Sequence, residues 1–333
     1  MSKMNRTILF LGILVLIFAQ SVYAGGGAAN SSAPAAEKYP SRPVTIICPP
    51  AAGGGTDLLL RAMAPALRDI LGQNVLVVNR PGAGMAIGFS SGAKEKPDGY
   101  NVIALTPELL AVPYVNPVDF TWHSFDIVSC VNSTYGTLSV NAKAPYNTVA
   151  EFVDYAKKHP GEIRFSNSGI GGNWHVLAAA FAAKAGIDVV HVPYDGGGPS
   201  AVALAGGHVE ASTASAQEMD VHVKAGNIKI LCVFAPQRNS GYPDVPTGAE
   251  VGYPDPILTI FRGFGVPNGT PPEIIKALDA ASKKALDDPE VTKFMDAQLF
   301  TKDYRNGEDF TKLLEREDAI YKEQVQALGL SKK

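Results

Sequence analysis

Short apolar runs alternate with helix-like segments along almost the whole chain, and this order limits the fold more than any other feature. Apolar runs of three to five residues predict strands, and the longer stretches between them predict helices. Such alternation indicates an α/β architecture with largely parallel sheets. Strands are predicted at 44–48, 75–78, 102–105, 127–131, 138–140, 164–166, 189–192, 230–234 and 264–266, and helices at 58–71, 149–158, 174–185 and 199–205, with further helix starts at "TPPEII" and at Pro289.

The N-terminus has the pattern of an export signal. Lys3 and Arg6 precede an apolar core, and small residues surround Ala24, after which cleavage is predicted, so residues 1–24 are assigned to a signal peptide. The core is shorter than the roughly 18 apolar residues that a membrane span needs, which leaves an uncleaved anchor as the minor alternative. Residues 25–38, rich in Gly, Ala and Ser, are predicted to be a flexible leader.

Composition excludes several classes of function. The net charge is −3 and no basic run is present, which argues against a nucleic-acid partner. The six histidines are scattered without ligand spacing, so neither a metal nor a cofactor is expected. Cys48, Cys130 and Cys232 each lie in an apolar context, which favours buried small side chains over a disulfide or a reactive thiol.

The stretch "CPPAAGGGTD", residues 48–57, joins a predicted strand to a predicted helix. Its glycines let backbone amides approach a ligand, and the helix N-terminus adds unpaired N–H groups with partial positive charge. Together they predict a socket for an anion. Asp57 has two possible roles, a helix acid that satisfies backbone amides or a contact for a cationic part of the ligand, and its position favours the first.

A second strand, small-residue turn and helix occur at "FSNSGIGGNWHVLAAAF", residues 165–181. Two such sockets predict two lobes that face one cleft, since ligands of open α/β sheets bind at the carboxyl ends of strands. His175 stands at the start of the second helix. A structural histidine and a ligand contact are equally consistent with that position.

Two motifs match enzyme patterns only in letters. In "NRPGAGMAIG" the third glycine, Gly88, comes one residue too late for a dinucleotide fingerprint, so a turn that lines the cleft is favoured. "GFSSG" has the letters of a nucleophile elbow around Ser90, but no strand runs into that serine. An ordinary helix interior is therefore favoured, and a secreted α/β hydrolase that uses Ser90 is the alternative function.

Several blocks match one family in order. They are "YPSRPVTIICPPAAGGGTDLLLRAMAPALRDILGQNVLVVNRPGAG", "KPDGYNVIALT", "VAEFVDYAKKHPGEIRFSNSGIGGNWH", "HVPYDGGGPSAVALAGGHVEAS", "PDVPTGAEVGYPD" and "GVPNGTPPEIIKAL". With them the chain from Tyr39 onward resembles the substrate-binding proteins of tripartite tricarboxylate transporters, the Bug or TctC family. The resemblance implies a periplasmic, two-lobed Venus-flytrap receptor, expected to be monomeric. Such a receptor binds a small organic carboxylate, delivers it to a membrane permease and performs no chemistry.

The resemblance also implies lobe boundaries and a binding site. Residues 39–138 and 261–333 would form lobe one, and residues 139–260 lobe two. The implied ligand-binding residues are Pro50, Ala51, Ala52, Gly53, Gly54, Gly55, Thr56, Asp57, Gly82, Ala83, Gly84 and Thr106 in lobe one, and Ser168, Gly169, Gly171, Gly172, Asn173, His175 and Asp195 in lobe two.

Some residues depart from the family pattern. Pro50 stands where phenylalanine is common, Met85 where glycine is common and Phe261 where tryptophan is common. Each departure changes the wall of the expected cleft, so the identity of the ligand cannot be inferred from that of a relative. Arg262 lies beside this wall, where a surface arginine is favoured over a fixed positive charge in the site.

Overall fold

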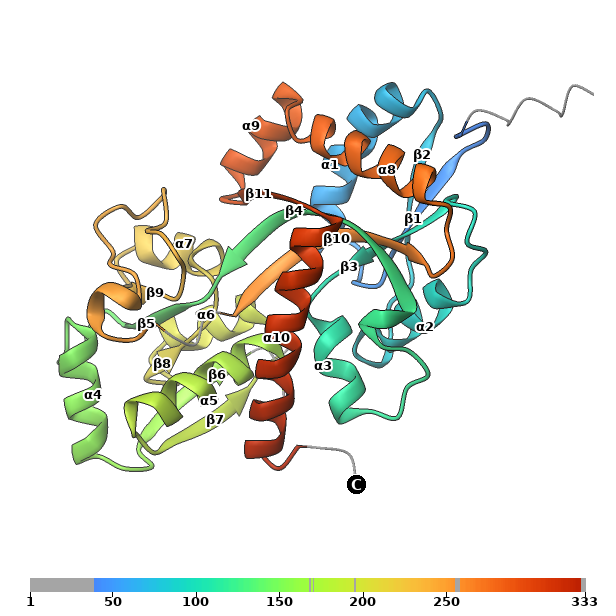
Figure 1. Cartoon of the computed structure of the whole chain (residues 1–333). Helices are drawn as coiled ribbons and strands as arrows, with labels where there is room; N and C mark the ends of the chain where they lie inside the picture. The colour runs from blue at the N-terminus through green and yellow to red at the C-terminus, as the bar shows by residue number, and fades with distance from the viewer. Residues whose placement is uncertain (1–38, 168, 170, 195, 255–257, 331–333) are drawn as a thin grey trace, which may run out of the picture. The chain divides into compact units, whose positions relative to one another are not determined.

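The computed structural model describes residues 39–167, 169, 171–194, 196–254 and 258–330. The predicted signal peptide and leader, as well as Ser168 and Asp195, lie outside the described residues. Within them the predicted α/β class is confirmed, because helices cover two separate sheets (Figure 1). None of the described helices is long and apolar enough to cross a bilayer.

The first sheet has six strands, and its parallel part comes from the beginning of the described chain. The strands lie in the order β11 (Thr301–Asn306), β4 (Phe125–Tyr135), β10 (Thr259–Pro267), β3 (Asn101–Leu105), β1 (Val44–Cys48) and β2 (Val75–Asn79). β1 pairs in parallel with β2 and β3. β10 pairs antiparallel with β3 and β4, and β11 extends the sheet antiparallel to β4.

The second sheet has five strands and is also mixed. Its order is β7 (Val189–Pro193), β6 (Ile163–Asn167), β8 (Ala211–Ser212), β5 (Thr137–Asn141) and β9 (Ile228–Val233). β6 is parallel to β7 and β8, whereas β5 is antiparallel to β8 and β9.

The prediction of largely parallel sheets is therefore wrong. The chain leaves the first sheet through β4, continues into β5 and returns through β10 (Figure 1). A strand that carries the chain out and a neighbour that carries it back run in opposite directions, so β4 and β10 pair antiparallel. Helical connections give parallel pairs only where the chain stays within one sheet.

Ten α-helices are assigned in the described part of the chain. They are α1 (Gly55–Leu71), α2 (Ala86–Ala93), α3 (Glu108–Val115), α4 (Val149–Lys158), α5 (Asn173–Ala185), α6 (Gly197–Ala205), α7 (Ala216–Lys224), α8 (Pro272–Ala285), α9 (Pro289–Ala297) and α10 (Gly307–Ala327). α4 coincides with its predicted range, and the helix starts at "TPPEII" and at Pro289 are confirmed. α10 contacts both α3 and α5, so it packs on helices that belong to different sheets.

The interior consists of apolar side chains from strands and from the inner faces of the helices. Leu59, Met63 and Leu67 of α1 pack with β1 in one cluster, and Phe152, Phe165 and Phe181 form part of another. All three cysteines are buried and unpaired, as predicted. Burial raises the pKa of each of the three thiols to about 12, which makes them inert at neutral pH.

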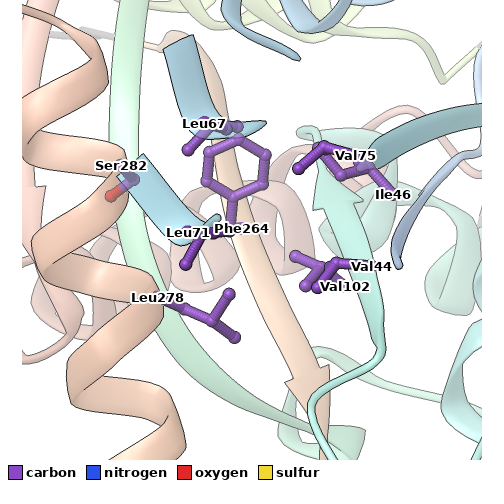
Figure 2. A pocket seen from close by; sticks show the side chains of 9 residues that line it. All are labelled: Val44, Ile46, Leu67, Leu71, Val75, Val102, Phe264, Leu278 and Ser282. Carbon is purple, nitrogen blue, oxygen red and sulfur yellow. The ribbon is translucent and has the colours of Figure 1, made fainter. Parts of the chain in front are cut away.

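One imperfection in the packing lies inside the first sheet's core (Figure 2). A cavity of about 20 Å³ separates α1 and α8 from the strands. Its lining is Val44, Ile46, Leu67, Leu71, Val75, Val102, Phe264, Leu278 and Ser282. The volume is that of about one water molecule, but an apolar lining offers water too few hydrogen-bond partners.

We expect Val102→Ile to raise the free energy of unfolding by about 0.5–1 kcal/mol, because one added methylene fills this cavity. Val140→Ile is the matched control, since Val140 is a fully buried strand valine that does not line the cavity. Overpacking there should lower stability by about 1 kcal/mol or more. Urea denaturation measures both, and equal losses in the two variants would contradict the prediction.

Candidate functional site

The ligand-binding residues predicted in the first part of the chain lie on loops at one edge of the first sheet. β1, β2 and β3 run parallel, so their carboxyl ends share this edge. The loop after β1 leads into α1, the loop after β2 leads into α2, and Thr106 directly follows β3. The residues placed along this edge are Pro50, Ala51, Ala52, Gly53, Gly54, Gly55, Thr56, Asp57, Gly82, Ala83, Gly84 and Thr106.

The second group follows β6 in the other sheet. Gly169, Gly171 and Gly172 form the turn between β6 and α5, while Asn173 and His175 belong to the first turn of α5. Gly171 lies close to the end of α3, the helix that follows Thr106 of the first group. A Cβ added at Gly171 would lie 3.3 Å from Val115 Cγ1. For Ser168 and Asp195 the predicted roles fall on residues that the structure does not describe.

The two loops have the same local geometry. Gly54 caps α1 with φ −75° and ψ 164°, and Gly172 caps α5 with φ −70° and ψ 166°. The preceding glycines, Gly53 and Gly171, have φ of +80° and +74°, a region that favours glycine. In each case the side chain at the third helical position accepts a hydrogen bond from that glycine's N–H. The two predicted sockets, "GGGTD" and "GGNWH", thus share one loop geometry.

Asp57 is the third-position residue of the first socket. Its carboxylate accepts hydrogen bonds from Gly53 N at 2.8 Å and from Asn79 Nδ2 at 3.0 Å, and it forms an ion pair with Arg61 at 2.9 Å. Hydrogen bonds from Arg61, Gly53 and Asn79 hold its pKa below the usual range although burial opposes them. Asp57 therefore stabilises the loop, which agrees with the favoured interpretation.

His175 is the third-position residue of the second socket. Its Nδ1 accepts a hydrogen bond from Gly171 N at 3.0 Å, and its ring lies 4.5 Å from that of His191 in an edge-on arrangement. Burial, and then the neighbouring His191, lower the pKa of His175 to about 4. The imidazole is therefore neutral at physiological pH and shapes the loop as Asp57 does in the first socket.

The helices that begin at these glycine loops have no side-chain cap. α1, α5 and α6 begin after glycines, Gly54, Gly172 and Gly196, that provide no side-chain cap. Side chains of Thr148, Ser215, Asp288 and Asn306 cap α4, α7, α9 and α10, whereas α2, α3 and α8 also lack a side-chain cap. The helices that start at the predicted site thus keep backbone N–H groups open to an external acceptor.

The loop after β2 is strained. Four successive residues have positive φ, Gly82 (127°), Ala83 (47°), Gly84 (62°) and Met85 (75°). Alanine and methionine seldom adopt this region, so the loop holds stored strain of the kind found at binding sites. The positive φ of Met85 also explains why glycine suits position 85. Met85 Sδ accepts a hydrogen bond from Thr106 Oγ1 at 3.6 Å, which links this loop to the end of β3.

Arg262 corrects one prediction, because it is not a surface arginine. From β10 its Nε donates to Thr56 Oγ1 at 3.1 Å, and its Nη1 donates to Asn132 Oδ1 at 2.5 Å. The guanidinium lies over the ring of Phe300 at 4.9 Å. A Cβ on Gly55 would lie 3.1 Å from Arg262 Nη2, so the charge sits directly beside the N-terminus of α1.

Two further polar side chains stand out in the second sheet's part of the site. Asn173 is only 4% exposed, and neither atom of its side-chain amide has a hydrogen-bond partner among the described residues. Glu218 of α7 accepts hydrogen bonds from Ser215 N and Ser215 Oγ at 2.9 and 2.8 Å. The sequence signal for Glu218 is the S-x-x-E capping box, which predicts a helix start and not a site.

A cavity of about 370 Å³ opens next to the start of α7, and none of the predicted ligand-binding residues that the structure describes is among those that line it. Thr134 and Tyr135 of β4, Ala216 and Gln217 of α7, and Thr301 of β11 are among its lining residues, so segments of both sheets enclose it. Thr134 Oγ1 also accepts from Arg262 Nη1 at 3.4 Å. No group of three or more His, Cys, Asp or Glu that could hold a metal ion was found in the described ranges.

Ser90 lies inside α2, as the favoured interpretation predicts. Its hydroxyl donates to Asp119 at 2.6 Å and accepts from Lys94 at 3.2 Å. Among the described residues no histidine forms a hydrogen bond with it, so the base of a serine hydrolase triad has no counterpart there.

Comparison with known proteins agrees with this arrangement. The model of the TctC family, described as tripartite tricarboxylate transporter family receptor, matches residues 59–330. Protein BugT of Bordetella pertussis is 31% identical over 306 residues, which cover 89% of each chain. A TctC solute-binding protein from Polaromonas, solved without ligand, is 40% identical with a TM-score of 0.79 and covers 87% of this chain and 99% of its own. An R. palustris protein solved with adipate is 28% identical with a TM-score of 0.75, covering 88% and 99%.

Two mixed sheets linked by crossing strands, with open loops at the carboxyl ends of strands in both, define a two-lobed periplasmic-binding-protein fold. The chain belongs to the TctC family of tripartite tricarboxylate transporter receptors, as its sequence blocks predict. It is therefore a member of a family of solute receptors and not of a family of enzymes.

Proposed function

We propose that this protein is an exported, monomeric receptor that binds a small organic carboxylate in the periplasm and delivers it to the permease of a tripartite tricarboxylate transporter. The observation that carries the proposal is the pair of uncapped helix N-termini, α1 and α5, each behind the same glycine socket. Partial positive charge and free N–H groups at such ends favour a carboxylate. The adipate bound by the R. palustris relative has this chemistry.

In this proposal the ligand lies between two lobes that close on it. Lobe one comprises residues 39–138 and 261–333, and lobe two residues 139–260. The amides of Gly55 and Thr56 hold the ligand from lobe one, and that of Asn173 holds it from lobe two, whereas Gly54 N and Gly172 N donate within their own loops to Ala51 O and Gly169 O. Asp57 and His175 keep the two loops in shape through their bonds to Gly53 and Gly171. Closure around a hinge is the expected motion, because both sockets must be engaged for full affinity.

The hydrolase alternative receives no support from the surroundings of Ser90, whose partners in the described residues are an aspartate and a lysine.

The proposal predicts that the protein, purified without refolding, carries a small acid that native mass spectrometry identifies by its mass. Small-angle X-ray scattering should then give a smaller radius of gyration with this acid than without it. A co-purified ligand without an acid group would contradict the ligand class, and an unchanged radius at saturation would contradict closure.

A further inference from the structure

Arg262 differs from every other arginine in the described part of the chain. The remaining eight each form an ion pair with an aspartate or glutamate at 4 Å or less, from Arg42 with Asp98 to Arg316 with Glu317. For Arg262 no such carboxylate is found among the described residues. Its acceptors, in Thr56, Asn132 and Thr134, are neutral oxygens.

The lack of a carboxylate partner in the described chain is unusual for a guanidinium in the surroundings of Arg262. Arg262 is half-buried, and burial lowers its pKa to about 10, so the cation is partly withdrawn from water and still charged at neutral pH. It also lies beside the N-terminus of α1, which carries partial positive charge of its own. Two positive groups next to each other are stabilised by an anion between them.

One edge of the guanidinium remains available. Nε donates to Thr56, and Nη1 donates to Asn132 and Thr134, whereas Nη2 has no acceptor in the described residues. Nη2 is the atom that faces Gly55.

Glu218 offers the competing explanation, since its charge raises the pKa of Arg262 and therefore lies near it. The two side chains do not form an ion pair within 4 Å, and Ser215 holds the Glu218 carboxylate through two hydrogen bonds. Glu218 also presses on the start of α6, where a Cβ added to Gly197 would overlap its carboxylate. Its position is thus fixed by its own lobe.

We propose that Arg262 is a specificity-determining residue of the receptor, whose guanidinium pairs directly with an acid group of the ligand beside the first turn of α1. This inference rests on the proposed function and adds to the backbone sockets a side-chain cation that selects charge. Asn173, with its buried unpaired amide at the start of α5, would meet a second polar group of the same ligand. The ligand class is a short acid with a polar group, such as a second carboxylate, at its other end.

The test compares wild type with Arg262→Gln and Arg262→Lys by calorimetry, using succinate, glutarate and adipate as probes. Arg262→Gln should weaken binding of the best probe by about ten- to hundredfold, because a charge-assisted hydrogen bond to the acid is lost. Arg262→Lys keeps the positive charge but not the planar guanidinium. Its affinity for the best probe should therefore lie between those of wild type and Arg262→Gln. Arg164→Gln, which breaks the ion pair of Arg164 with Glu210 near the start of β6, is the matched control and should bind like wild type.

Glu218→Gln separates the two explanations. If Arg262 serves the ligand, removing the nearby negative charge should leave binding unchanged or strengthen it. If the two residues instead form a pair that closes the lobes, both variants should lose affinity equally, and that result would overturn the inference. Wild-type affinity for an Arg262→Gln variant that melts normally would overturn it too.

A measurement on wild type avoids dependence on folding of the variants. A carboxylate on the guanidinium slows its rotation, so one arginine in ¹⁵N spectra should gain resolved Nη signals when the best probe is added. Unchanged arginine signals in a saturated sample would refute the pairing while leaving the receptor function intact. Failure of wild type to bind every probe and every co-purified acid would refute the proposed function, and this inference with it.

Discussion

Replacing Gly54 with valine should weaken ligand binding by about ten- to hundredfold or more, because a side chain at the cap of α1 blocks approach to the open amides. The fold should survive the change. Gly54 has φ −75° and ψ 164°, which any residue adopts, and the nearest atom to an added Cβ is Ala51 O at 3.4 Å. Calorimetry with the co-purified acid, together with a thermal melt, measures the two effects separately.

Thr56→Ser is the control for this experiment. Serine keeps the hydroxyl that accepts from Arg262 Nε, so both binding and melting temperature should stay close to those of wild type. Tight binding by a folded Gly54→Val variant would remove the first socket from the site. Gly53 is unsuitable for the same test, since its φ of +80° would strain any side chain and mix folding with binding.

The loop geometry of the two predicted sockets could be inferred from the sequence because its signals are local. Strand, glycine turn and helix follow one another within ten to twenty residues in each, and hydrogen bonds such as Gly53 N to Asp57 span four residues. The role of Asp57 followed from its place in the first turn of the helix. The same reasoning left His175 undecided, because a histidine at that place accepts a backbone N–H only as the neutral tautomer that burial selects.

The misjudged features depend on partners that are distant in sequence. Arg262 binds Thr56 across 206 positions and Asn132 across 130, so no window of sequence contains its environment. The prediction of parallel strands was wrong for the same reason, because the path of the chain between the two sheets sets the antiparallel pairing of β4 with β10. The edge strand β11, "TKDYRN", escaped prediction because it is partly exposed and polar and has no apolar alternation.

Glu317 of α10 gives the second large effect, a change in stability with pH. The residue is fully buried, its Oε1 accepts from Thr259 N at 3.0 Å and from Arg316 at 3.3 Å, and Oε2 has no partner among the described residues. Burial raises the pKa of its carboxyl from 4.5 to about 7. The folded state therefore holds this proton more tightly than the unfolded state does. The resulting stabilisation is complete below pH 4.5 and is lost as the pH rises through about 7.

Glu317→Gln should be free of this loss, because its amide oxygen can still accept from Thr259 N and it cannot ionise. Relative to wild type, the variant should have a similar free energy of unfolding at pH 4.5 and an advantage approaching about 3 kcal/mol at pH 8. Urea denaturation of both proteins at several pH values gives the difference, in which the other titrating groups cancel. Glu250→Gln is a control of opposite sign, because Arg238 lowers the pKa of Glu250 to about 2. Glu250→Gln should have a lower free energy of unfolding than wild type at neutral pH, and this difference should shrink in acid. A difference between Glu317→Gln and wild type that does not vary with pH would mean that the buried carboxyl keeps its ordinary pKa.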